Sequence, residues 1–248
     1  MDTLVVGAGA MGRWFAEALE AGASRPVSVA FTDADPAAAR DAAQATDGRA
    51  ADGDPDERFD LVCVAVPIPA AADAIAEYTP RAERAIVDVT GTAQDPVAAM
   101  REHARDLERI SLHPLFAPEN GPGNVAIVPD APGPVTDEVR EALTARGNHC
   151  FETTAAEHDR AMETVQARVH AAVLAFGLAA EDVPAAFQTP VSEELFDLLD
   201  QVAGGDPRVY ADIQDAFEGA ADVADAARAI ADADHEQFRD LYREAGER

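Results

Sequence analysis

The chain has 248 residues and 48% of them are apolar, enough for one large domain or two modest ones with a full core. Aspartate and glutamate total 47 against 19 basic residues, every one an arginine, and the formal net charge is −28. This charge argues against nucleic acid as a partner, because its phosphates would be repelled. No apolar run reaches the ~18 residues that a membrane helix needs, and no signal peptide is apparent, so we expect a cytoplasmic protein with no membrane partner.

The acidic residues are scattered between apolar positions along the whole sequence rather than gathered in one tail. A disordered acidic segment would lack that apolar pattern, so we expect a folded chain. Self-repulsion of this size opposes a compact state in dilute buffer, and molar salt weakens it by shrinking the Debye length to ~3 Å. We therefore interpret the chain as salt-adapted, with an ordinary acidic protein as the alternative.

Only two cysteines are present, Cys63 and Cys150. Cys63 lies inside the apolar run 61–66 and is expected to be a small buried residue. Neither cysteine belongs to a closely spaced pair of the kind that binds metals, so the sequence predicts no disulfide and no metal site.

The first part of the sequence alternates between strand and helix patterns. Strands are predicted at residues 3–6, 27–32, 61–66, 85–89, 110–112 and 125–128, and helices at 11–21, 36–46, 70–78, 96–105 and 135–146. This alternation predicts an α/β fold with a parallel sheet and helices on both faces. From residue 155 onward no strand is predicted, and helices are expected at 154–176, 191–202, 207–218 and 222–245.

A glycine motif follows the first predicted strand. Gly7, Gly9 and Gly12 form a GxGxxG pattern at the start of a helix, and Asp33 ends the second strand 21 residues after Gly12. The glycines permit a tight turn, a close approach of pyrophosphate and close helix packing, while the carboxylate suits ribose hydroxyls and repels a 2′-phosphate. The pattern predicts a doubly wound Rossmann domain that binds NAD rather than NADP. The alternative is a glycine turn beside a solvated aspartate.

The expected cofactor-binding residues gather at the carboxyl edge of this sheet. They are Gly7, Gly9, Ala10, Met11, Gly12, Asp33, Pro67 and Thr90.

Several further segments carry a family resemblance. They are GAGAMGR at 7–13, DLVCVAVPI at 60–68, VDVTGTAQDP at 87–96, SLHPLFAPE at 111–119, EHDRAMETVQARVHAAVLAFGL at 157–178, TPVSEELF at 189–196 and GDPRVYADIQ at 205–214. On these segments the chain resembles the prephenate dehydrogenases of tyrosine biosynthesis, as a salt-adapted, haloarchaeal-like member. The HPLFAPE and EHD segments are the specific ones, because generic Rossmann enzymes lack them.

The resemblance implies an NAD-binding Rossmann domain over 1–150 and an all-helical substrate and dimerisation domain over 151–248. It implies a homodimer that oxidises prephenate with NAD and releases carbon dioxide, giving 4-hydroxyphenylpyruvate. Two alternatives stay open. One is a dehydrogenase of the same fold for arogenate or another small acid, and the other is a non-catalytic dinucleotide-sensing protein.

The resemblance also assigns roles to single residues. His113 matches the family histidine at the substrate hydroxyl, and an unperturbed pKa near ~6.5 suits a general base. The substrate-binding residues that it implies are His170, Gln166, Glu119 and Thr92. His158 and Met162 share the helical stripe of Gln166 and His170, and for His158 a structural role is at least as well supported.

Two departures from the family pattern concern polar groups. Gly91 and Ala93 stand where members often have serine and lysine, so the hydroxyl is expected from Thr90 or Thr92. The family arginine that pairs with the ring carboxylate is also missing, because Ser192, Glu193 and Glu194 occupy its stretch. A dicarboxylate substrate needs a cation, and Arg208 or an arginine of a partner subunit is expected to supply it.

Overall fold

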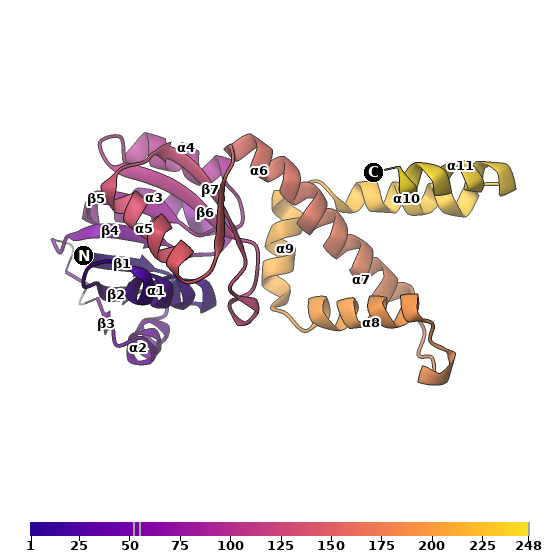
Figure 1. Cartoon of the computed structure of the whole chain (residues 1–248), viewed down its shortest axis with the longest axis horizontal. Coiled ribbons are helices and arrows are strands. Elements are labelled where there is room, and N and C mark those ends of the chain that lie inside the picture. The colour runs from indigo at the N-terminus through magenta and orange to yellow at the C-terminus, as the bar shows by residue number, and fades with distance from the viewer. Residues whose placement is uncertain (52, 55, 248) are drawn as a thin grey trace. The chain divides into compact units, whose positions relative to one another are not determined.

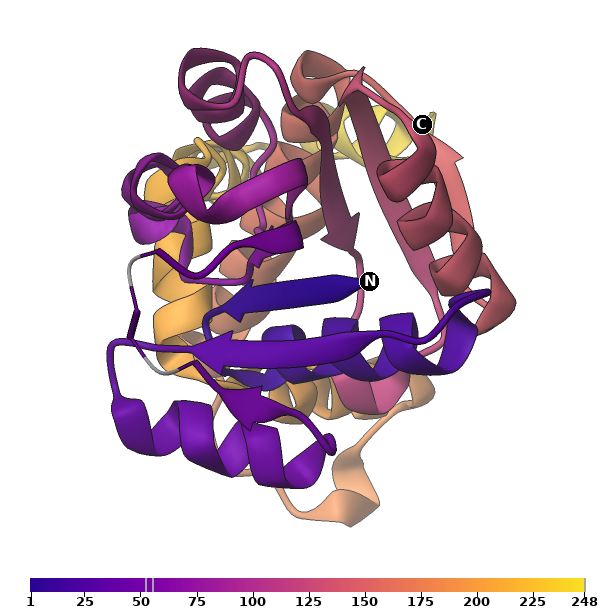
Figure 2. The same ribbon diagram turned by 90° about the vertical axis from the view of Figure 1, so that its left-hand side faces the viewer.

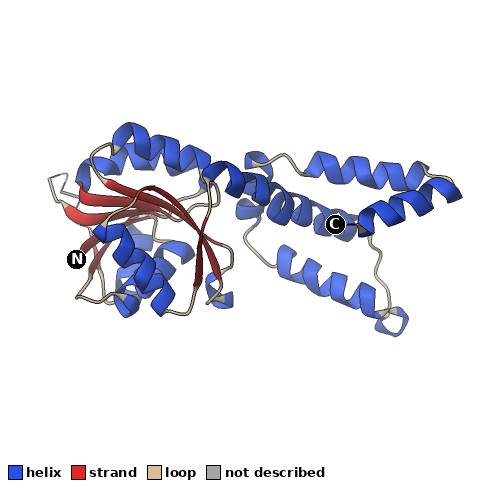
Figure 3. Cartoon of the chain, turned by 45° about the horizontal axis from the view of Figure 1, so that its top comes forward, coloured by secondary structure: helices blue, strands red, loops and turns tan. Residues whose placement is uncertain are grey.

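The computed structural model describes residues 1–51, 53–54 and 56–247. The chain folds into two compact units, residues 1–159 and residues 160–248, and every strand of the described residues lies in the first unit (Figure 3). The division falls later than residue 150, because the intervening segment stays bonded to the first unit. The Thr153 N–H donates to the Ile127 carbonyl over 2.9 Å, and Asp159 accepts the Ala93 N–H over 2.9 Å.

The first unit contains one eight-stranded sheet. Its strands are β1 (Asp2–Val6), β2 (Ser28–Thr32), β3 (Arg49–Ala50), β4 (Phe59–Val64), β5 (Ala82–Asp88), β6 (Glu108–Pro114), β7 (Asn124–Ala131) and β8 (His149–Glu152). They lie in the order β3-β2-β1-β4-β5-β6-β7-β8. The order reverses beside β1, which is the doubly wound pattern predicted from the sequence, and ligands of such sheets bind at this switch point.

Five helices of eight or more residues cover the sheet. They are α1 (Ala10–Gly22), α2 (Pro36–Ala45), α3 (Ala71–Tyr78), α4 (Gln94–His103) and α5 (Pro134–Ala145), and short 3₁₀ turns occupy η1 (Ile68–Ala70), η2 (Thr79–Arg81) and η3 (Pro118–Asn120). Figure 2 shows helices on both sides of the strands. Asp35 caps α2, since its carboxylate accepts the Ala37 N–H over 2.9 Å.

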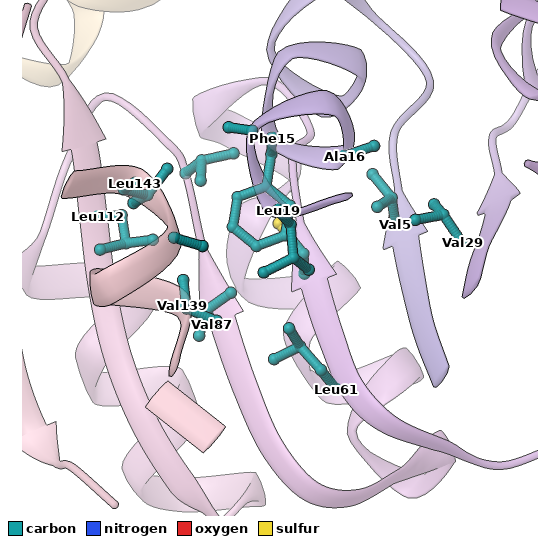
Figure 4. Packing of buried hydrophobic residues seen from close by; sticks show 14 of the residues in the cluster. Val5, Phe15, Ala16, Leu19, Val29, Leu61, Val87, Leu112, Val139 and Leu143 are labelled. Carbon is teal, nitrogen blue, oxygen red and sulfur yellow. The ribbon is translucent and has the colours of Figure 1, made fainter. Parts of the chain in front are cut away.

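Alternate side chains of each strand serve the two faces of the sheet. Val5 and Val87 pack with α1, α2 and α5, whereas Leu4 and Ile86 pack with α3 and α4. In Figure 4, Phe15 of α1 lies over the first of these faces, and it is fully buried. Burial of each such side chain contributes about 1.5–3 kcal/mol of hydrophobic stabilisation. The core therefore holds the strands in place, and with them the edge of the sheet at which the parallel strands end.

The sheet differs from the sequence prediction in three respects. β7 runs antiparallel to β6 rather than parallel, because the nine residues 115–123 between them are too few for a crossover helix. His113 lies within β6, paired with Ala126, instead of following the strand. The short edge strands β3 and β8 were not predicted, since neither has an apolar run.

All regular secondary structure among the described residues of the second unit is helical. One helix enters it as α6 (Ala155–Met162), continues as the π-helical segment η4 (Glu163–Arg168) and ends as α7 (Val169–Ala179). The 3₁₀ turn η5 (Ala185–Phe187) and the helices α8 (Pro190–Ala203), α9 (Pro207–Ala216), α10 (Ala220–Asp232) and α11 (His235–Gly246) follow. Figure 1 labels these helices.

The last predicted helix, 222–245, is in fact two helices. Asp234 begins the second one, because its carboxylate accepts the N–H groups of Glu236 and Gln237 and the Gln237 side chain accepts the Asp234 N–H. No helix in the described part of the chain is long and apolar enough to cross a membrane.

Candidate active site

The turn after β1 has the geometry that the glycine motif requires. Gly7 has φ of +99°, and a Cβ atom there would collide with the Ala65 carbonyl, while one on Gly12 would collide with the Gly7 carbonyl. A Cβ atom on Gly9 would meet nothing within 4 Å. Gly7 and Gly12 are therefore required by the packing of the chain itself, and Gly9 leaves open space in front of the helix. That space fits the approach of a pyrophosphate.

The groups around this turn fit a dinucleotide. No side chain caps α1 at Gly9, so its first N–H groups are available to an anion. Asp33 follows β2 and is held beside the turn, because one carboxylate oxygen accepts the Ala8 N–H over 2.7 Å and the other accepts the Asp35 N–H over 2.9 Å. Pro67 follows β4 at the same edge of the sheet.

His113 lies at the end of β6 in a chain of three polar side chains. Its Nδ1 lies 2.8 Å from Nε2 of His158, and Nδ1 of His158 lies 2.8 Å from Oδ1 of Asp159. All three residues are buried. The sequence analysis singled out His113, regarded a structural role for His158 as at least as well supported, and did not consider Asp159, although both belong to the EHD segment that carried the resemblance.

Asp159 is held firmly by the loop that follows β5. Its carboxylate accepts the backbone N–H groups of Ala93 and Gln94 and the Gln94 side-chain amide, all within 3.0 Å. Burial acts to raise the pKa of Asp159, but the hydrogen bonds from His158, Ala93 and Gln94 outweigh it and hold the pKa below its ordinary value. Helix α6 is thereby tied to the start of α4.

The expectation of an unperturbed His113 is wrong. Burial and, to a smaller extent, the neighbouring His158 ring lower the pKa of His113, the Asp159 carboxylate opposes them, and the net result is a pKa of about 3. The imidazole is therefore neutral through the physiological pH range. A neutral imidazole presents one N–H and one bare nitrogen, and only the bare nitrogen accepts a proton.

Gly91 lies beside the other nitrogen of His113. A Cβ atom on Gly91 would lie 3.9 Å from His113 Nε2 and 3.0 Å from Cδ1 of Ile68. The position where the family often has serine therefore does face this imidazole, and here it offers no hydroxyl. The Thr90 hydroxyl is engaged elsewhere, since it lies 2.7 Å from a carboxylate oxygen of Asp88.

Asp88 is a buried carboxylate that sequence reasoning missed. It ends β5 and is fully buried, and one of its oxygens has no hydrogen-bond partner among the described residues. Burial raises the pKa of Asp88 to about 6, against the lowering effects of the Thr90 and Ser111 hydroxyls, the Thr90 N–H and the nearby His158 ring. An acidic residue at the end of an apolar strand was the signal that went unused.

The other residues expected near the substrate lie in different surroundings. Thr92 is buried beside the loop that holds Asp159, and Glu119 is exposed on η3. A cleft of about 300 Å³ lies behind the glycine turn. Its lining includes Arg13, Trp14, Arg146 and Asn148, and neither arginine has an ion-pair partner among the described residues.

Gln166 and His170 belong to the second unit, on successive turns of the long helix. The His170 ring packs edge-on against Tyr210 of α9 with centroids 4.8 Å apart, and the Gln214 amide donates to the Ala167 carbonyl over 2.9 Å. Burial lowers the pKa of His170 below its ordinary value. Three buried atoms here have no hydrogen-bond partner among the described residues, namely Oε1 of Gln166, Nδ1 of His170 and Oε1 of Gln214.

The long helix is π-helical at Gln166, which sequence periodicity did not indicate. Such insertions are frequent at functional sites, because they redirect side chains. Among the described residues, no group of three or more histidine, cysteine, aspartate or glutamate side chains is arranged to hold a metal ion.

Comparisons with known proteins give this geometry a family. Residues 15–126 match the sequence model of the prephenate dehydrogenase nucleotide-binding domain. The 4-amino-4-deoxyprephenate dehydrogenase of Streptomyces pristinaespiralis is 32% identical over 97% of this chain and 88% of its own length. A probable arogenate/prephenate dehydrogenase of Methanocaldococcus jannaschii is 27% identical over 64% of this chain and 39% of its own length.

Solved structures share the fold across the whole chain. The structure of Aquifex aeolicus prephenate dehydrogenase in complex with hydroxyphenyl propionate and NAD⁺ superposes with a TM-score of 0.74, covers 100% of this chain and 92% of its own, and is 17% identical. The NAD⁺ in that complex agrees with the cofactor predicted from the glycine motif. The match to the Streptomyces enzyme extends over nearly all of both proteins, and the chain therefore belongs to the prephenate dehydrogenase family and is a dehydrogenase with a nucleotide-binding N-terminal domain.

Proposed function

We propose that the chain is an NAD-dependent prephenate dehydrogenase. It would convert prephenate and NAD⁺ into 4-hydroxyphenylpyruvate, carbon dioxide and NADH, and the reaction needs no other co-substrate. The observation that carries this proposal is the buried, neutral His113, whose Nδ1 is engaged by His158 and whose Nε2 faces Gly91 at the carboxyl edge of the sheet. A neutral imidazole so placed is a general base for the hydroxyl at the carbon that loses hydride.

A single general base accounts for every proton that moves in this reaction. Nε2 of His113 takes the proton of the C4 hydroxyl while the C4 hydrogen leaves with its electron pair, and the C4 oxygen becomes a carbonyl. The bonding pair of the ring carboxylate then enters the ring, carbon dioxide leaves, and the oxygen regains a proton as the ring becomes aromatic. NAD, when bound, supplies the acceptor of the hydride.

A base whose pKa is about 3 is sufficient for this step. The C4 hydroxyl becomes strongly acidic as the hydride departs, because positive charge develops on its carbon. The proton therefore moves late, toward a group that does not need to be strongly basic beforehand. The low pKa also keeps the base unprotonated at every working pH.

The residues that would hold the dinucleotide surround the glycine turn. Gly7, Gly9, Ala10, Met11 and Gly12 would receive the pyrophosphate at the N-terminus of α1. The Asp33 carboxylate, which is fixed by two backbone N–H groups, would accept the adenosine ribose hydroxyls and repel a 2′-phosphate. Pro67 and Thr90 would lie toward the nicotinamide end.

The helical unit would bind the side chain of the substrate. We infer this role for Gln166 and His170, and the family resemblance separately gives Thr92 and Glu119 of the first unit a substrate-binding role. The free atom of Gln214 must be its oxygen, because its amide nitrogen is committed to the Ala167 carbonyl. Unpartnered acceptors suit a substrate with hydrogen-bond donors, and this favours arogenate, the aminated analogue of prephenate, as a second candidate.

The cation for the ring carboxylate has two candidate sources in the chain. Arg208 lies in the first turn of α9 and is exposed, as an arginine available to a ligand would be. Arg13 lies one turn into α1, half-buried in the cleft beside the glycine turn. A charge-assisted hydrogen bond to a carboxylate is worth about 1.5–3 kcal/mol, so a single arginine is enough to matter.

The acidic composition and the helical unit support two further proposals. The net charge of −28 with no lysine favours a salt-adapted, cytoplasmic enzyme, in keeping with two free cysteines. Large apolar side chains of the helical unit, such as Leu178, Phe187 and Val191, are at least three-quarters exposed. We propose that a second copy covers them in a homodimer formed through residues beyond 150.

One assay tests the function and its alternatives together. NADH formation is measured in 2 M KCl with prephenate, arogenate and 4-amino-4-deoxyprephenate, the last being the substrate named for the Streptomyces relative. The highest kcat/KM is expected with prephenate. A higher value with either aminated compound would transfer the assignment to that substrate, and no turnover with any of them would favour a dinucleotide-sensing protein.

A further inference from the structure

We propose that His158 and Asp159 are positioning residues that fix the tautomer of His113, so that its Nε2 is always the bare, proton-accepting nitrogen. The proposal rests on His113 being the base in the proposed function. It follows from three successive hydrogen bonds that lie within the first unit, and each bond determines which atom donates in the next.

The donor in the first side-chain contact, between His158 and Asp159, is determined by Asp159. Both of its oxygens already accept from donors that have no alternative, because the N–H groups of Ala93 and Gln94 are backbone groups. A carboxylate held ionised by these bonds accepts only. Nδ1 of His158, 2.8 Å from Oδ1, must therefore carry the hydrogen of that contact.

The donor in the second contact, between the His158 and His113 rings, then follows. When His158 carries a single hydrogen, that hydrogen is the one on Nδ1 and its Nε2 is bare, and this nitrogen lies 2.8 Å from Nδ1 of His113. Two bare nitrogens at this distance would repel each other, so Nδ1 of His113 must donate. Because a neutral imidazole carries one hydrogen, Nε2 of His113 is left bare.

This order of donors matters because the opposite tautomer is inactive. With the hydrogen on Nε2, His113 would present a donor toward Gly91 and could take no proton from a hydroxyl there. A histidine free in water prefers that tautomer modestly, and a buried one takes whichever tautomer its partner demands. The same logic, in which a carboxylate orients a catalytic histidine, governs the serine protease triad, but here the carboxylate acts through an intervening imidazole.

Two substitutions at His158 separate this role from simple packing. His158→Leu keeps a side chain of similar bulk but removes the acceptor, so kcat should fall roughly 10²-fold, within the range that a general base contributes. In His158→Gln the amide can donate to Asp159 while its oxygen accepts from His113. His158→Gln should therefore recover most of the lost kcat, while KM and the affinity for NAD change little in both variants. His103→Leu, an exposed histidine of α4, is the control for loss of a histidine.

The tautomer is read directly by ¹⁵N NMR of the imidazole nitrogens in the full-length protein in 2 M KCl. His113→Asn identifies the His113 signals by their disappearance. In the unmodified protein and in His158→Gln, Nε2 of His113 is expected to be unprotonated and Nδ1 protonated. In His158→Leu the proton is expected to move to Nε2.

Several outcomes would overturn the proposal. A proton on Nε2 of His113 in the unmodified protein would do so without any variant, even if His158→Leu failed to fold. Full kcat in His158→Leu, or a loss in His158→Gln as large as in His158→Leu, would also reject it. The proposed function has a separate test, because full activity of His113→Asn would remove His113 as the base and leave the NMR result standing.

Discussion

The two units of the chain bury their apolar side chains to different extents. In the first unit, large side chains such as Phe15, Phe31 and Leu112 are less than 2% exposed, and the sheet is covered on both faces. In the second unit, few large apolar side chains among the described residues are buried, Val173 and Ile213 among them, and Leu178 is 91% exposed. The Rossmann unit therefore encloses its own core, whereas the helical unit leaves apolar side chains that burial elsewhere would stabilise.

This difference matches a division of labour in the proposed reaction. The base, its hydrogen-bonded partners and the glycine turn all belong to the well-buried unit, where a fixed geometry favours proton and hydride transfer. The residues proposed to bind the side chain of the substrate belong to the helical unit. Substitutions in the first unit should therefore lower kcat, and substitutions in the second should raise KM.

The largest expected effect is at the base itself. His113→Asn keeps a polar side chain but cannot accept the proton, so kcat should fall roughly 10²- to 10⁴-fold, the usual contribution of general base catalysis. NAD affinity should hardly change, because the glycine turn is untouched. Steady-state kinetics and equilibrium binding of NAD measure the two quantities.

The pH dependence gives a second test of this base. Because the pKa of His113 is about 3, the unmodified enzyme should show no loss of activity from this group between pH 8 and pH 5. An acid limb near pH 6.5 assigned to His113 would contradict that value.

The next effect decides which unit supplies the carboxylate-binding cation. Arg13→Gln and Arg208→Gln remove one guanidinium from each unit, and the one that binds the ring carboxylate should raise KM for prephenate roughly 10- to 100-fold, as the loss of a charge-assisted hydrogen bond predicts. Arg84→Gln, an exposed arginine in β5, is the control. Unchanged KM in both variants would reject both arginines as the source of the cation.

His170 tests the helical unit. His170→Ala removes a proposed contact to the substrate that is equal in the ground and transition states, so KM should rise about 10-fold, as loss of one hydrogen bond of about 1.4 kcal/mol implies, with kcat nearly constant. Steady-state kinetics in high salt with prephenate and arogenate give both values. A large fall in kcat with unchanged KM would place His170 among the reacting groups instead.

Salt should affect the two units unequally. Ion pairs of the first unit connect separate elements, as Arg109–Asp130 and Arg25–Glu138 do, whereas two of those in the second unit, Arg228–Asp225 and Arg243–Asp240, join neighbours on one helix. Pairs of the latter kind contribute only about 0.3–0.5 kcal/mol. Hydrogen exchange in 0.1 M and 2 M KCl should show residues 160–247 losing protection first at low salt, and equal protection of both units would contradict this expectation. Sedimentation in 2 M KCl tests the dimer.

Patterns local in the sequence predicted most of this structure. The glycine turn and Asp33 were recognisable because the spacing of the three glycines and the aspartate stands in one short segment of the sequence, and short apolar runs located the six main strands. The antiparallel β7 was missed because direction depends on the length of the connection rather than on the strand's own residues. The break at Asp234 was missed because a capping side chain competes with an otherwise continuous helical pattern.

The site was only partly predictable for a different reason. His113 and Asp159 are 46 positions apart and meet through His158, so no local pattern connects them. The pKa of His113 could not be read from its neighbours in sequence, because burial by the whole first unit sets it. Asp88 was hidden for the same reason, as its burial depends on strands on both sides of β5.

Asp88 offers the most specific effect, a change in how stability depends on pH. The pKa of Asp88 is raised from 3.8 to about 6 on folding, so the folded state takes up this proton first, and stability is gained as pH falls from about 6 toward 4. The pKa of His113 is lowered from 6.5 to about 3, so stability is lost as pH falls through the same range. The two contributions oppose each other between about pH 4 and pH 6, and the core of the first unit is partly protected from acid.

Asp88→Asn removes one side of this balance. The amide oxygen keeps the contact with the Thr90 N–H, and the amide nitrogen replaces the carboxylate oxygen that lacks a partner. At pH 7.5 the variant should be the more stable protein, since it buries no charge. Its advantage should shrink by about 1.4 kcal/mol for each pH unit below 6 and disappear near pH 4. Urea unfolding in 2 M KCl from pH 7.5 to pH 4.5 measures this difference, with Asp41→Asn, an exposed carboxylate of α2, as the control. An advantage that stayed constant with pH would show that Asp88 has an ordinary pKa and that its burial is relieved in solution.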